Sequence, residues 1–123
     1  LRDARIPDNT GYQPIDTPVV PDGPAAFFST LPVKAIAARI QSDGLPAAVS
    51  NTAGTYVCNS LLYTLLHTAA LEYPGLRGGF LHVPYAIEQL PGKPGDTFGM
   101  KLCDIARALT CAVEAIAEHL LER

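Results

Sequence analysis

Apolar residues recur at helical spacing in three segments of the chain, residues 32–44, 58–72 and 100–121. The first segment has Pro32 in its opening turn and stops at Gly44, a residue type that commonly ends helices. The second carries one apolar face, formed by Leu61, Leu62, Leu65, Leu66 and Ala69. The third carries an apolar stripe, formed by Leu102, Ile105, Leu109, Val113, Ile116 and Leu120. We therefore expect three helices.

Short apolar runs separate these helices. Residues 46–50 ("PAAVS") and 77–84 ("RGGFLHVP") indicate buried strands, and residues 25–32 are either a strand or a packed edge segment. Residues 1–24 are rich in proline and indicate a long arm, and residues 84–99 indicate a loop. Helices that alternate with strands predict an α/β fold, an open and mostly parallel sheet flanked by helices. Such sheets normally hold more strands, so we expect a single domain over residues 1–123 that lacks its N-terminal part.

Composition excludes several classes of protein. The net charge of -3 and the absence of a basic cluster argue against nucleic-acid binding. No uncharged apolar run is long enough to span a bilayer, and no signal-peptide pattern opens the chain. The three cysteines form no CxxC motif, and no metal-ligand spacing is present. These features predict a reduced, cytoplasmic protein that needs no membrane.

Cys58 has an unusual position, because it follows the polar, glycine-broken loop of "AVSNTAGTYVCNSLLYTLLH" and begins a leucine-rich helix. A helix N-terminus carries a partial positive charge that stabilises a thiolate, so this position suits a nucleophile. The other interpretation, a small buried apolar side chain, is the one that composition alone favours.

Three histidines compete as the base for Cys58. His67 lies nine residues further along the same helix, which places it on the opposite face. His119 lies in the last turn of the third helix. A surface histidine there interacts favourably with the helix dipole, which accounts for its position without catalysis. His82 lies at the end of a predicted strand, where α/β folds bind their ligands. It is the geometrically sensible partner, although a purely structural histidine remains the alternative.

Four stretches resemble the pyroglutamyl peptidase I family of cysteine peptidases: "DARIPDNTGYQP", "STLPV", "SNTAGTYVCN" and "GFLHVPYAIEQ", in this order. The resemblance covers essentially the whole chain. It implies an open α/β sheet, often assembled as a homotetramer, and an enzyme that removes N-terminal pyroglutamyl residues from peptides without a cofactor. It also implies the roles of five residues. The nucleophile falls on Cys58, the base on His82 and an oxyanion-stabilising arginine on Arg5, while Tyr56 and Val57 line the lactam pocket.

The chain also departs from this family. The glutamate of the family's Cys-His-Glu triad lies upstream of "DARIPDN", where this chain has only Leu1 and Arg2. We therefore expect full activity to need an N-terminal segment that carries the glutamate. Two alternatives stay open: a non-catalytic remnant that binds pyroglutamyl peptides or a partner, and another Cys-His amidase such as a glutaminase.

Overall fold

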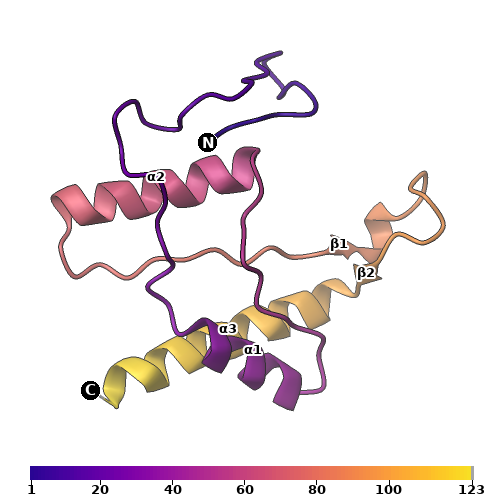
Figure 1. Cartoon of the computed structure of the whole chain (residues 1–123). Coiled ribbons are helices and arrows are strands. Elements are labelled where there is room, and N and C mark those ends of the chain that lie inside the picture. The colour runs from indigo at the N-terminus through magenta and orange to yellow at the C-terminus, as the bar shows by residue number, and fades with distance from the viewer. Residues whose placement is uncertain (123) are drawn as a thin grey trace. The chain divides into compact units, whose positions relative to one another are not determined.

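The computed structural model describes residues 1–122 and contains three α-helices and one small sheet (Figure 1). The helices are α1 (Val33–Ser42), α2 (Val57–Glu72) and α3 (Leu102–Leu121). Each lies in a segment whose apolar spacing predicts a helix, so the three predicted helices are confirmed. Between α2 and α3 lie β1 (Tyr85–Ala86), the short 3-10 helix η1 (Ile87–Gln89) and β2 (Gly99–Met100).

The ends of α1 follow from local chemistry. Pro32 precedes the helix, where its missing N–H costs nothing, and its carbonyl accepts the N–H of Ile36 at 3.0 Å. Gly44 takes a left-handed φ of 81° just after the helix, a conformation that glycine adopts without strain. Its N–H closes the last turn on the carbonyl of Gln41 at 3.0 Å.

The sheet differs from the expected one. Its two parallel strands pair Tyr85 with Gly99 and Ala86 with Met100, whereas residues 46–50 and 77–84 are extended without strand assignment. The prediction of strands in these two segments is therefore wrong for the described residues. An apolar run favours extended backbone, but a strand also needs a hydrogen-bonded neighbour, and that neighbour is not encoded locally.

The chain divides into two compact units, of which the first combines Leu1–Leu31 with Ser50–Phe80. Here Ser29 and Thr30 are hydrogen-bonded to Gly78. The N–H of Thr30 donates to the Gly78 carbonyl at 3.0 Å, and the N–H of Gly78 donates to the Thr30 hydroxyl at 2.7 Å. On α2, Leu66, Ala69 and the ring of Tyr63 are buried.

The second unit combines Pro32–Val49 with the chain from Leu81 onward, and in it α1 packs on α3 (Figure 1). Its buried side chains are Ile36, Ile40, Leu45, Ile105, Cys111, Ala112 and Ala115. Arg39 of α1 forms ion pairs with Glu114 at 2.7 Å and Glu118 at 2.8 Å on α3. Hydrogen bonding to Glu118, above all, raises the pKa of Arg39, so its charge is kept at any accessible pH.

The buried faces of two helices differ from the predicted ones. On α3 the stripe is mostly exposed: Leu102 is 64% and Val113 66% exposed, and Ile105 alone among the stripe is fully buried. On α2, Leu61 and Leu65 are exposed. The buried residues of α3 are Ile105 and three small ones, Cys111, Ala112 and Ala115. None of the described helices is long and apolar enough to cross a membrane.

Candidate active site

A hydroxyl-rich loop of residues 50–56, here called the cysteine loop, leads into α2. The Ser50 hydroxyl donates to the Thr52 carbonyl at 2.8 Å, and the N–H of Gly54 donates to the Thr52 hydroxyl at 2.9 Å. Gly54 has a φ of 77°, which a side chain would strain. The polar residues and the glycine therefore give the loop a defined turn, and the turn sets where α2 begins.

Cys58 is the second residue of α2 and its side chain is half-buried. The side chain of Tyr56, the residue before this helix, makes no capping hydrogen bond. Backbone N–H groups at a helix start favour a nearby negative charge when no cap claims them. This position is consistent with a nucleophile at Cys58, an assignment that stays a prediction. The other two cysteines lie on α3, Cys103 exposed and Cys111 buried.

The segment that carries Arg5 is bonded to the cysteine loop. The N–H of Asp3 donates to the Thr55 carbonyl at 2.8 Å, and the Thr55 hydroxyl donates to the Asp3 carbonyl at 3.0 Å. One residue beyond the cysteine, the Asn59 amide donates to the Leu1 carbonyl at 2.7 Å. These contacts place the segments of Arg5 and Cys58 in the same compact unit, as the assignment of both to one site requires.

Arg5 itself is exposed on a fixed backbone. The preceding residue, Ala4, is only 2% exposed, and its N–H donates to the Pro14 carbonyl at 2.8 Å. The Ala4 carbonyl accepts the side-chain amide of Gln13 at 3.0 Å. The residue before Arg5 is therefore anchored to residues 13–14.

Tyr56 and Val57 border a cavity of about 210 Å³ in the first unit. It is lined by Arg2, Asp8, Tyr12, Pro14, Thr55, Tyr56, Val57 and Ser60. Asp8 accepts the hydroxyl and the N–H of Thr10, and these hydrogen bonds lower the pKa of its carboxyl. Cys58 is not among the lining residues, which agrees with the ~100° step around the helix that separates it from Val57.

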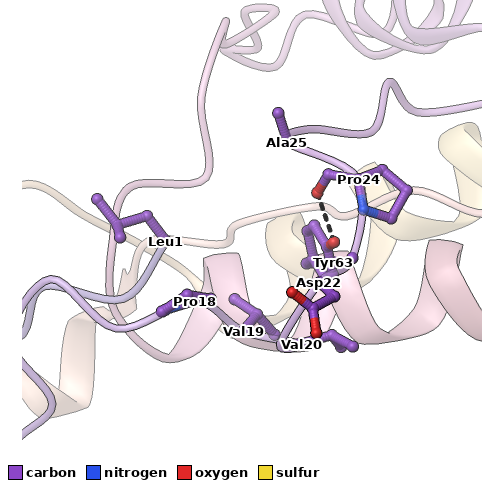
Figure 2. A pocket seen from close by; sticks show the side chains of 9 residues that line it. Leu1, Pro18, Val19, Val20, Asp22, Pro24, Ala25 and Tyr63 are labelled. Carbon is purple, nitrogen blue, oxygen red and sulfur yellow. Dashed lines mark hydrogen bonds between the residues drawn. The ribbon is translucent and has the colours of Figure 1, made fainter.

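A second cavity of about 260 Å³ lies in the same unit (Figure 2). Figure 2 shows the hydroxyl of Tyr63 bonded to the Pro24 carbonyl at its wall. The remaining lining residues are Leu1, Pro18, Val19, Val20, Asp22, Gly23 and Ala25. None of the five predicted site residues borders this cavity, so it is not part of the candidate site.

The three histidines lie in different surroundings. His82 belongs to the second unit, exposed on the extended segment before β1, and its pairing with Cys58 stays a prediction. His67 stacks on Tyr63 with ring centroids 5.9 Å apart and meets the Phe27 ring edge-on at 5.9 Å. That ring packing explains His67 without a catalytic role. His119 lies in the last turn of α3, as expected.

Sequence reasoning missed Thr55 and Asn59, which flank "YVC" and are hydrogen-bonded to residues 1–3. No sequence signal marks these bonds, because they join residues 52 and 58 positions apart. Among residues 1–122, no group of three histidine, cysteine or acidic side chains is arranged to hold a metal ion.

Comparison with known proteins identifies the class. The family model described as pyroglutamyl peptidase matches residues 1–119. The chain is 70% identical over 121 residues to a pyrrolidone-carboxylate peptidase of Streptomyces coelicolor, covering 98% of this chain and 55% of that protein. A relative of the same name from Streptococcus pneumoniae serotype 4 is 54% identical over 117 residues, which cover 95% of this chain and 54% of that protein. This chain therefore belongs to the pyroglutamyl peptidase family.

Solved structures agree with this assignment. The crystal structure of pyroglutamyl peptidase I from Bacillus amyloliquefaciens superimposes with a TM-score of 0.91 at 44% identity, covering 97% of this chain and 57% of that chain. Pyrrolidone carboxyl peptidase from Thermococcus litoralis gives a TM-score of 0.91 at 41% identity, covering 98% and 57%. The predicted α/β fold class is confirmed. The chain spans about half the length of the curated relatives it matches.

Proposed function

We propose that the protein to which this chain belongs is a cysteine omega-peptidase that hydrolyses the bond after an N-terminal pyroglutamyl residue. The observation that carries the proposal is the family match over residues 1–119. The position of Cys58 in the first turn of a helix supports it, because the chemistry needs a thiolate there.

In the proposed reaction, His82 takes the proton of the Cys58 thiol, and the sulfur attacks the carbonyl carbon that joins pyroglutamate to the next residue. The oxyanion of the tetrahedral intermediate is stabilised by the Arg5 guanidinium and by N–H groups at the start of α2. Each such donor is worth ~3 kcal/mol in well-studied hydrolases. His82 then donates its proton to the leaving amine, the C–N bond breaks and a thioester remains.

Water completes the reaction. His82 removes a proton from a water molecule, whose oxygen attacks the thioester carbonyl. The C–S bond then breaks, pyroglutamate leaves, and the proton returns to the Cys58 sulfur. No cofactor takes part in either half of this scheme.

Substrate recognition falls to Tyr56 and Val57. Pyroglutamate is a neutral lactam, so its pocket needs apolar walls and few hydrogen bonds rather than a counter-charge for an ammonium group. An aromatic ring and an aliphatic side chain suit such walls, and both border the 210 Å³ cavity of the first unit.

The proposal includes a part from outside these 123 residues. A glutamate in the N-terminal segment of the same protein orients His82 and completes the triad. The protein is cytoplasmic and assembles as a homotetramer. The support for these statements is the family resemblance.

The test uses the intact protein as its source cell makes it. It should release a fluorophore from a pyroglutamyl conjugate, and Cys58→Ala should abolish this release. Cys103→Ala is the matched control, because that exposed cysteine on α3 has no role in the scheme. A protein that cleaves a glutamine amide equally well would instead be a different Cys-His amidase. A folded, inactive protein that still binds pyroglutamyl peptides would be a non-catalytic remnant.

A further inference from the structure

Hydrogen bonds attach the Arg5 segment to the chain on both sides of Cys58. Residues 1–5, here called the Arg5 arm, are bonded at two points on either side of Cys58, to Thr55 of the cysteine loop and to Asn59 of α2. Before the cysteine, Thr55 both accepts from and donates to the backbone of Asp3. After it, the Asn59 amide donates to the carbonyl of Leu1. Two neighbouring attachment points fix both the distance and the direction of one segment relative to the other.

We propose that Thr55 and Asn59 are positioning residues that hold Arg5 in register with Cys58. The inference rests on the proposed function, in which Arg5 stabilises the oxyanion that forms at the carbon attacked by Cys58. Such stabilisation depends on a donor lying within hydrogen-bond distance of an atom that exists only during the reaction. A guanidinium on a mobile segment would lose conformational entropy when the oxyanion forms. On a segment that is already fixed, this entropy has been lost during folding.

The anchoring of Ala4 strengthens this inference. The Ala4 backbone is bonded on both its N–H and its carbonyl, and the residue is buried. The two residues before Arg5 are thus each bonded on both backbone groups, Asp3 to Thr55 and Ala4 to residues 13–14. Arg5 follows directly on this bonded segment, and Thr55 supplies one of its two anchors.

The side-chain bond from Thr55 can be removed without removing the backbone bond beside it. Thr55→Val keeps the shape of the residue and the Asp3 N–H to Thr55 carbonyl contact, and it loses the hydroxyl donor. We expect kcat to fall about twofold to tenfold, the range that one net hydrogen bond supports. KM should change much less, because the oxyanion is absent from the bound substrate.

The experiment is kinetic and uses the intact protein with the pyroglutamyl fluorophore conjugate. Thr55→Ser restores the hydroxyl and should restore kcat. Thr110→Val is the matched control, because Thr110 also donates its hydroxyl to a carbonyl, within α3. The decisive comparison repeats Thr55→Val in an Arg5→Ala background, where the loss of kcat should disappear. An undiminished loss in that background would overturn the inference and show that Thr55 acts independently of Arg5.

A second readout does not depend on turnover. Iodoacetate is an anion and iodoacetamide is neutral, so a guanidinium held near the sulfur raises the ratio of their alkylation rates at Cys58. Thr55→Val, Asn59→Leu and Arg5→Ala should each lower this ratio, and Thr110→Val should not. If the intact protein proves inactive, the proposed function fails and the ratio alone decides the inference. If the protein is active and neither kcat nor the ratio responds to Thr55→Val, the inference alone is refuted.

Discussion

Gly79 lies where the structure leaves no space for a side chain. A Cβ built on it would lie 2.5 Å from Cδ1 of Leu31 and 2.6 Å from the hydroxyl oxygen of Ser29. Leu31 relieves the first contact by rotating. Ser29 is restrained, because its hydroxyl donates to the Gly78 carbonyl at 3.1 Å and accepts the N–H of Leu31 at 3.2 Å. The methyl group of Gly79→Ala must therefore displace the 29–31 backbone or break these bonds.

The magnitude follows from two opposing effects. Forcing an additional carbon into a packed site typically costs about 1–3 kcal/mol. Replacing glycine at an unstrained φ recovers about 0.4–1 kcal/mol, because the unfolded chain loses freedom. Gly79→Ala should therefore lower the free energy of unfolding by about 1–2 kcal/mol.

Gly95→Ala provides the matched control for Gly79→Ala. A Cβ on Gly95 has nothing within 4 Å and its φ is not in the left-handed range, so this substitution should be neutral or slightly stabilising. The assay is equilibrium unfolding of the intact protein in urea, with both variants compared with the parent at equal concentration. A Gly79→Ala variant as stable as Gly95→Ala would refute the packing described for residues 29–31 and 78–79.

Three further predictions concern the site and the helix pair. Iodoacetamide should label Cys58 faster than the exposed Cys103, as peptide mass mapping would show; equal rates would count against activation by the helix start. Under the proposed scheme, His82→Gln should lower kcat by about 10²–10⁴, whereas His67→Gln should leave it nearly unchanged; the reverse order would mean that the base is misassigned. The stability difference between Arg39→Ala and the parent should shrink as salt is raised, because the ion pairs of Arg39 are exposed and screened. A difference that is independent of salt would show that Arg39 acts through packing of its aliphatic stem.

The helices were predictable from the sequence because their signals are local. Pro32 and Gly44 bound α1 within a few residues of its ends, and the cysteine block places the start of α2 within one residue. The strands were not, since apolar runs at 46–50 and 77–84 do not specify a partner. The buried face of α3 was missed for a related reason. Its large apolar side chains mark one stripe, but tertiary packing decides which face is buried, and that face runs through Ile105, Cys111, Ala112 and Ala115.

The candidate site was likewise predictable only in part. The sequence located Cys58 at a helix start and indicated Arg5, Tyr56 and Val57 by resemblance, and the structure brings the segments of these residues into one unit. The bond between the Arg5 arm and Thr55 was not predictable, because it joins residues 52 positions apart and neither side of it has a sequence signature.

That separation has a consequence for how the protein folds. Closing a long loop costs chain entropy before any contact offsets it, so distant contacts form slowly, whereas a helix such as α2 forms from neighbours. The start of α2 should thus appear early in folding, and the Arg5 arm should join it late. During synthesis the Arg5 arm leaves the ribosome before the cysteine loop does. It therefore cannot form its hydrogen bonds until the loop and the start of α2 have been synthesised. A newly made Cys58 therefore passes through a period in which it lies on a helix but lacks its neighbouring segment, and its reactivity should mature only when the arm docks.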